Sequence, residues 1–216
     1  MNKMYAAIVV TALSWVGIAQ AGELANSEEL KSLQHEWAQI NYEMNDDAKE
    51  AAFEALAKKA HAWSEEHHNQ AEPLIWEAII KSTYAGAKGG LGALSLMEEA
   101  RDLLLKAEKI NSKALNGSIY TSLGSFYYMT PGWPIGFGDD DKAEEYLAKA
   151  LEMAPNDMDA NYFSGDFWLE EHKYKKAAEY LQKVIDLPNV EDRPVYSKGR
   201  KAEAVERLEK AKKHIH

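Results

Sequence analysis

The chain has 216 residues, enough for one domain with a sizeable core, and 46% of its residues are hydrophobic. Its formal net charge is −10, so we expect no nucleic-acid partner, because an acidic surface repels phosphate backbones. The absence of cysteine excludes disulfides, thiolate metal sites and cysteine nucleophiles. Ala, Leu, Glu and Lys are abundant and strand-like alternation is rare, which together predict an all-α protein.

The N-terminal segment has the layout of a secretory signal peptide. Lys3 precedes an apolar run that ends at Ile18, and Ala19-Gln20-Ala21 forms a small-x-small cleavage site. The apolar run is shorter than the roughly 20 residues that a membrane-spanning helix needs. We therefore predict a signal peptide over residues 1–21, a periplasmic location without stable membrane insertion, and one mature domain over residues 22–216. An uncleaved anchor or a buried helix is the alternative.

The next predicted elements are two helices, over residues 28–44 and 47–67, which form a pair with weak repeat character. The second helix carries four clustered side chains, His61, Glu65, His67 and His68. His61 and Glu65 are four residues apart and could share a helix face as metal ligands, but a solvated polar face is the interpretation we favour. No serine lies in a G-x-S-x-G motif, and no acidic pair stands out. We expect no metal, no cofactor and no catalysis.

Two later segments of the chain repeat one another. Residues 119–128 align with residues 160–169, and this places Gly124 on Gly165. A second helical pattern follows each segment, and it places Ala143 on Ala177, 34 residues further along the chain. A small residue on each of two packed helices lets the helices approach closely, so we predict repeated antiparallel helix pairs.

The repeat resembles the tetratricopeptide repeat (TPR) family over roughly residues 72–188. The family pattern is W-x2-L-G-x2-Y, then A-x3-F, then P, with a period of 34 residues. The matching residues in this chain are Tyr120, Leu123, Gly124, Tyr127, Ala143, Leu147, Ala150 and Pro155. The resemblance implies a solenoid of stacked helix pairs that binds a protein or peptide partner and performs no catalysis.

Further elements extend the predicted solenoid at both ends. Residues 74–84 align with residues 118–128, with Ile80 in place of the small residue, and residues 99–110 supply the second helix of that pair. Residues 196–216 form a single, highly charged helix, which suits a capping helix with one face in water. The chain is thus expected to form about four antiparallel helix pairs plus a C-terminal capping helix.

Two Gly-rich insertions lengthen neighbouring repeats. Twelve residues separate Gly165 from Ala177, as in a standard repeat, but nineteen separate Gly124 from Ala143 and twenty separate Ile80 from Ala100. The extra residues fall in the segments 85–95 and 129–139. The first could be a flexible linker or a tight loop. Because equivalent loops of stacked repeats emerge side by side, we expect the two insertions to touch and to form one composite surface.

The second insertion contains the aromatic residues Trp133 and Phe137 and ends in the acidic run 139–141. We interpret the aspartates as the N-cap and first turn of a helix. A calcium site would need more oxygen ligands than this run supplies, and a phosphate cradle would be repelled by it. The two aromatic side chains are either anchors that fasten the loop or an exposed recognition element, with one or both rings lying against the glycines of the first insertion.

The candidate binding residues lie on the first helices of the repeats, one turn apart, where the concave wall of such a solenoid is expected. A merely solvated concave face is the alternative. The predicted partner-binding residues of the groove and loops are Glu77, Lys81, Tyr84, Thr121, Ser125, Tyr128, Trp133, Phe137, Tyr162 and Asp166, with Leu169 beside them.

Three classes of function follow from these patterns. The first is an exported interaction protein that binds a protein or peptide. The second is a small-ligand accessory protein, because the chain also resembles, more loosely, the periplasmic T-component of TRAP transporters. The third, an enzyme, is not expected. An open groove would favour the first class, and an enclosed apolar channel would favour the second.

Overall fold

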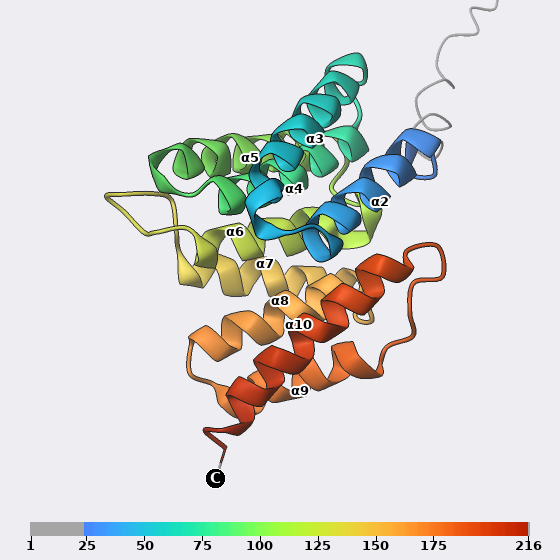
Figure 1. Ribbon diagram of the computed structural model, residues 1–216. Helices are drawn as coiled ribbons and strands as arrows, with labels where there is room; N and C mark the ends of the chain where they lie inside the picture. The colour runs from blue at the N-terminus through green and yellow to red at the C-terminus, as the bar shows by residue number, and fades with distance from the viewer. Residues whose placement is uncertain (1–23, 216) are drawn as a thin grey trace, which may run out of the picture.

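The protein is described by a computed structural model over residues 24–215 (Figure 1). The predicted signal peptide lies outside the described residues. Within them, nine α-helices and one short 3-10 helix are present and no strand is formed, so the predicted all-α class is confirmed. The elements are α2 (Glu28–Glu43), α3 (Asp46–Glu66), α4 (Ala71–Lys88), α5 (Gly90–Asn111), η1 (Ala114–Gly117), α6 (Ser118–Met129), α7 (Asp140–Met153), α8 (Met158–Glu170), α9 (Tyr174–Asp186) and α10 (Pro194–Lys212).

Side-chain caps and proline explain where several helices begin. Ser27, Asp139 and Asp157 each accept a hydrogen bond from the backbone N–H three residues further on, at the starts of α2, α7 and α8. Pro194 occupies the first turn of α10, where its missing N–H costs no hydrogen bond. The interpretation of the aspartates as cap and first turn is therefore confirmed.

The helices pack in the predicted pairs, α2 with α3, α4 with α5, α6 with α7, and α8 with α9, followed by α10 (Figure 1). Gly124 and Gly165 form the predicted close contacts within their pairs. A Cβ at either position would lie 2.6 Å from the Cγ atom of Leu147 or Leu181, respectively. The predicted architecture, a TPR-like solenoid of four helix pairs plus a C-terminal helix, is confirmed.

The first helices of the pairs and α10 form a closed ring, which the sequence did not predict. Contacts join α2 to α4, α4 to α6, α6 to α8, α8 to α10, and α10 back to α2. Figure 1 shows α2 and α10 lying over the same face of the layer that contains α4, α6 and α8. The Trp37 ring lies 6.5 Å from that of Tyr196, and His35 Nε2 lies 2.7 Å from the Asp192 carbonyl. The C-terminal helix is thus a closing element as well as a cap.

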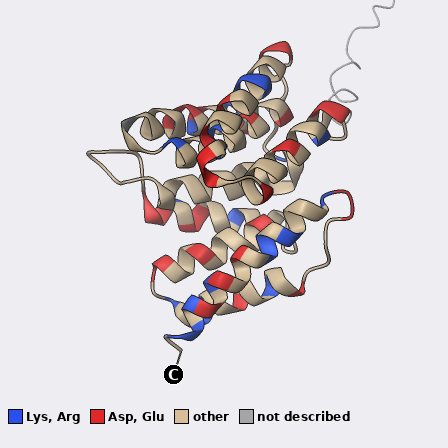
Figure 2. Ribbon diagram, viewed as in Figure 1, with Lys and Arg blue, Asp and Glu red and all other residues tan. Residues whose placement is uncertain are grey.

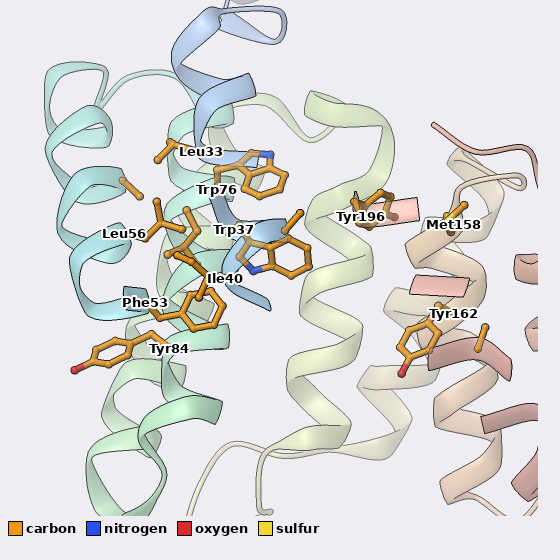
Figure 3. Close-up of a cluster of buried hydrophobic side chains, with 14 of the residues drawn as sticks. Leu33, Trp37, Ile40, Phe53, Leu56, Trp76, Tyr84, Met158, Tyr162 and Tyr196 are labelled. Atoms are coloured by element: carbon orange, nitrogen blue, oxygen red, sulfur yellow. The ribbon is translucent and has the colours of Figure 1, made fainter. Parts of the chain in front are cut away.

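The buried apolar residues form two clusters. Figure 3 shows part of one cluster, in which Leu56 and Phe53 lie near Tyr84, and Trp37 lies beside Trp76. The second cluster joins α4, α5, α6 and α7, and it contains Ala78 together with Ala100.

The structure shifts the predicted register of the α4–α5 repeat. Ile80 was expected at the small-residue position, but it belongs to the first cluster, whereas Ala78 lies among the residues that face α5. The alignment with the α6 repeat is therefore displaced by two residues. A methyl side chain at Ala78 allows the close helix approach that the isoleucine would prevent.

The first Gly-rich insertion is not a loop. It extends both helices, because α4 continues to Lys88 and α5 begins at Gly90, with only Gly89 between them. Gly89 has a φ of 63°, a conformation that glycine adopts readily, so it permits the sharp reversal. The second insertion is a true loop between α6 and α7, with a cis peptide bond between Trp133 and Pro134. Among the described residues, no helix is long and apolar enough to span a membrane.

Candidate functional site

Two adjoining cavities, both open to solvent, lie between the helices of the ring. The first, with a volume of about 430 Å³, lies at the N-terminal ends of α6, α8 and α10, and we call it the polar chamber. The second, of about 540 Å³, lies at the C-terminal ends of α4 and α6, and we call it the apolar chamber. Both chambers are lined by Trp37, Ser82, Thr83, Ser125, Phe126, Phe163 and Arg200. Because they share these residues, the two cavities adjoin one another along α6, and together we call them the channel.

The apolar chamber is lined mainly by hydrocarbon side chains. They come from the end of α4, the start of α5, the end of α6 and the loop that follows α6. They include Ala85, Ala93, Leu94, Met97, Met129, Pro131 and Ile135. Met129 and Ile135 are 52% and 68% exposed, so they stand at the outer mouth of this chamber. An apolar molecule or segment entering from solvent would meet these two side chains first.

The polar chamber contains two arginines with different surroundings. Arg200 is buried, and its guanidinium donates to Asp159 Oδ1 at 2.7 Å and to Glu203 Oε2 at 2.6 Å. Arg193 has no carboxylate within salt-bridge distance among residues 24–215, and its buried Nε atom has no hydrogen-bond partner there. Its guanidinium carbon lies 4.0 Å from the centre of the Tyr196 ring. Arg200 is thus paired with two carboxylates at salt-bridge distance, whereas the charge of Arg193 acts on Asp157 only from beyond that distance.

Asp157 and Asp159 are the carboxylates that line the polar chamber. Asp157 accepts the Ala160 N–H at 2.8 Å as the cap of α8, and Asp159 accepts from Arg200. Desolvation by the surrounding protein, followed by repulsion from Asp159, raises the pKa of Asp157 to about 6. Both carboxylates are therefore engaged in contacts with the protein itself.

Two of the predicted groove residues, Thr121 and Ser125, line the polar chamber, and Ser125 also lines the apolar one. Glu77 and Lys81 lie elsewhere. Glu77 is buried and accepts hydrogen bonds from Ser64 and from His61 Nδ1, and the Lys81 ammonium lies 3.2 Å from it. Together these contacts join α3 to α4, which is a structural role.

The remaining predicted groove residues also lie away from the channel walls. Tyr84 is buried in the cluster of α2, α3 and α4. Tyr128 donates a hydrogen bond to Asp166 Oδ2 at 2.8 Å, and Arg207 Nε lies 3.0 Å from Asp166 Oδ1, so this network joins α6, α8 and α10. Burial raises the pKa of the Asp166 carboxyl despite its charged neighbour. The last residues, Tyr162 and Leu169, are buried in the first hydrophobic cluster.

Several channel residues were missed from the sequence. Trp37 lies on α2, Tyr196 and Arg200 lie on α10, and Arg193 is the N-cap of α10; neither helix matches the repeat pattern, so neither was expected to face the interior. Trp76 lies on α4, where the predicted register did not place it in the channel wall. One signal was available in the sequence. Gly199 lies inside an otherwise charged helix pattern, and a glycine there indicates a close approach by another element.

The loop between α6 and α7 presents one aromatic ring to solvent and partly buries the other. Trp133 is 89% exposed. Phe137 packs edge-on against Tyr127, with 5.5 Å between ring centres, and the Arg101 guanidinium lies 4.5 Å above its ring. The expected contact between the two insertions is present, because a Cβ on Gly136 would lie 3.1 Å from Leu94. The idea that a ring covers the glycines of the first insertion is wrong, since the space beside Gly86, Gly89 and Gly90 is open.

The described residues hold no group of three or more His, Asp or Glu side chains arranged to bind a metal. Residues 130–138 of the loop between α6 and α7 carry no charged side chain, whereas Figure 2 shows Lys and Arg spread along α10. The candidate site is therefore the channel, together with the uncharged loop at its apolar mouth.

No family model and no curated protein match this chain. Among solved structures, one described as the crystal structure of MamA has a TM-score of 0.45 and 19% identity, covering 80% of this chain and 95% of its own. A second, described as the crystal structure of MamA protein, has a TM-score of 0.44 and 19% identity, covering 87% and 93%. At this level of similarity, the TPR-like fold is assigned from the helix pairs described above.

Proposed function

We propose that this protein is a TPR-type interaction protein that docks a protein partner on the loop between α6 and α7. The observation that carries the proposal is the exposure of Met129, Trp133 and Ile135 on an uncharged loop. Solvated loops rarely expose several large apolar side chains together, and such patches are typical of interaction sites. A tryptophan is also the side chain most often found at the energetic centre of an interface.

The location differs from the concave groove expected of a TPR-like solenoid. In this protein α2 and α10 close the ring, so an extended peptide has no open concave surface to lie on. The loop stands at the apolar end of the channel, and there the Ile135 and Met129 side chains continue into the chamber wall. We infer that the partner presents an apolar segment, because residues 130–138 of the loop carry no charged side chain for an ion pair.

A binding experiment with matched variants tests this proposal. The mature protein, residues 22–216, is used as bait for proteins of the same compartment, beside the double variant Trp133→Ser/Ile135→Ser. The control is Ile110→Ser/Val205→Ser, which removes two other exposed apolar side chains, 40% and 42% exposed. We expect the loop variant to lose a specific partner that both the parent and the control retain. Equal retention by all three baits would refute the loop as the docking site.

We also propose that the protein is exported to the periplasm. The support is the sequence pattern of Lys3, the apolar run to Ile18 and the site at Ala21. Intact-mass measurement of the protein recovered from the producing cell tests this. A mass that begins at Gly22 supports export and cleavage, and a mass that retains residues 1–21 would show that the segment is kept.

A second candidate function is favoured by the channel itself. A cavity of several hundred Å³ with apolar walls and a few polar groups is typical of small-molecule sites. The two chambers have this size and this mixture of side chains. The binding of a small molecule inside the ring is therefore the alternative to partner docking, and both functions can coexist in one protein.

A further inference from the structure

We infer that the polar chamber binds the carboxylate group of an amphipathic small molecule, with Arg193 as the binding residue and the apolar chamber as the site of the hydrocarbon part. This inference rests on the second candidate function, a small molecule inside the ring. It adds the chemical class of the ligand and the direction in which the ligand lies.

The first support is the unpaired charge of Arg193. Within the described part of the chain, no carboxylate lies within salt-bridge distance of this side chain, although it lies at the wall of the polar chamber. Its Nε atom is shielded from solvent and has no hydrogen-bond partner there. A guanidinium donates through a planar fork that matches a carboxylate, so a carboxylate ligand would supply the partner that the protein does not.

The second support is the aromatic wall that holds this guanidinium. Arg193 lies over the Tyr196 ring at 4.0 Å and near the Trp76 ring at 5.6 Å. Trp76 in turn lies edge-on to Trp37, with 6.4 Å between ring centres (Figure 3). Contacts with ring faces restrict the side chain and keep it in the chamber. A donor held in one orientation binds an anion more tightly than a mobile surface arginine does.

The third support is the direction of the helices. The N-terminal segments of α6 and α8 line the polar chamber through residues 115–118 and 156–159, and Arg193 is the N-cap of α10. Helix N-termini carry partial positive charge, which favours an anionic group. Asp157 and Asp159 oppose this, but one caps α8 and the other is paired with Arg200. Arg193 is therefore the arginine of this chamber that has no salt-bridge partner among the described residues, although its charge acts on Asp157 from a greater distance.

The apolar chamber suits the rest of such a ligand. It adjoins the polar chamber along α6, and its far walls are formed by Leu94, Met97 and Met129. Helix α6 runs from Ser118 to Met129, and its 12 residues span about 18 Å at the usual rise per residue of an α-helix. The channel therefore has room for a flexible hydrocarbon chain of medium length that ends in a carboxylate.

The experiment uses two ligands that differ only in charge, decanoate and its neutral primary amide, decanamide. Binding of each is measured by isothermal titration calorimetry with the mature protein. We expect decanoate to bind about 10- to 100-fold more tightly than the amide, which corresponds to about 1.5–3 kcal/mol for a hydrogen bond to a charged group. Arg193→Met keeps the apolar stem and removes the charge, so it should weaken decanoate binding by about this factor and abolish the preference over decanamide.

Arg101→Met is the matched control. Arg101 also lies against an aromatic ring, that of Phe137, but it lines neither chamber. This variant should keep the full preference for decanoate. Thermal melts of both variants show whether each is folded before binding is compared.

The outcomes separate the two levels of the inference. If decanoate and decanamide bind equally, and Arg193→Met changes neither, the channel binds small molecules but the assignment of a carboxylate to Arg193 is overturned. If neither molecule binds the parent, both the carboxylate site and the small-molecule function are overturned for a ligand of this class. If Arg101→Met also loses the preference, the effect does not come from the chamber, and the assignment fails.

Discussion

The backbone of Gly199 in α10 packs directly against the aromatic ring of Tyr42 in α2. This contact joins the two helices that close the ring of helices. A Cβ at position 199 would lie 2.3 Å from the Tyr42 Cγ atom and 2.4 Å from Cδ1, closer than real side-chain contacts allow. The Tyr42 hydroxyl also donates to Glu203 Oε2 at 3.2 Å, one turn further along α10. Burial accordingly raises the pKa of Tyr42. The channel exists because these two helices can approach this closely.

Gly199→Ala should therefore push α2 away from α10. The expected cost is about 1–3 kcal/mol of unfolding free energy, the usual range for overpacking a well-filled contact. In a protein of this size, that corresponds to a drop in melting temperature of roughly 2–12 °C. Gly86→Ala is the control, because nothing lies within 4 Å of a Cβ there. It should stabilise the protein by about 0.5–1 kcal/mol, since alanine favours helix. If both variants melt alike, Gly199 does not close the ring.

Gly124→Leu and Gly165→Leu test the contacts within the repeats. The side chain would be forced into Leu147 in the first case and into Leu181 in the second. Each variant should lose about 1–3 kcal/mol by the same overpacking mechanism. The two sites lie in different helix pairs, so the double variant should show nearly additive losses in chemical denaturation. Melts that match the parent would show that the helix-pair register is wrong.

The repeat was predictable from the sequence because its residues contact the other helix of the same pair. The ring was not predictable, because it depends on contacts between helices at the two ends of the chain. The spacing of Ala143 and Ala177, 34 residues, is a pattern with a known period. The contact of Tyr42 with Gly199 spans most of the sequence, and neither helix has a repeat signature. The predicted concave wall included Thr121 and Ser125, which do line the channel, but it missed Arg193, which precedes a proline in a segment that resembled a plain connector.

The register error in α4 has a simple physical origin. Sequence alignment placed Ile80 at the small-residue position because Trp76 was matched to a tyrosine of the next repeat. In the structure, Trp76 faces the channel and Ala78 faces α5. In a standard repeat, the fixed spacing between the small residue of the first helix and the alanine of the second helix would have shown the error. The Gly-rich insertion between α4 and α5 changes this spacing, so it could not serve as a check. Glu77, Lys81 and Tyr84 were thereby assigned to a groove that they do not face.

Trp133→Ala and Phe137→Ala should separate a recognition residue from an anchor. Trp133 is 89% exposed, so its removal should change the unfolding free energy by no more than about 0.5 kcal/mol. Phe137 packs on Tyr127 and beneath Arg101, so its removal should cost about 1–2 kcal/mol. Urea denaturation of both variants measures this. A large loss of stability in Trp133→Ala would show that the exposed ring is an anchor, and the docking surface would then lack its tryptophan.

The last prediction concerns Glu72, a buried carboxylate in the first turn of α4. Its Oε2 atom has no hydrogen-bond partner among the described residues. Desolvation raises its pKa above the ordinary value of 4.5, although a hydrogen bond from its own backbone N–H opposes the shift. A carboxyl group whose pKa is higher in the folded than in the unfolded state binds its proton more readily when folded. The ionised form therefore lowers stability at neutral pH, and this penalty is relieved as the pH falls through the folded pKa toward 4.5.

Glu72→Gln should accordingly raise the unfolding free energy at pH 7, and the gain should vanish as the pH is lowered to about 4, where Glu72 of the parent is protonated in both states.

Glu54→Gln is the opposite case. The hydrogen bond from Lys58, and then its charge, lower the pKa of Glu54, so its carboxylate adds a little stability at pH 7 that is lost on acidification. Urea denaturation of the parent and both variants from pH 4 to pH 7 distinguishes the two signs. If Glu72→Gln is less stable than the parent at pH 7, then the ionised Glu72 has a favourable partner, and the burial argument for its raised pKa is wrong.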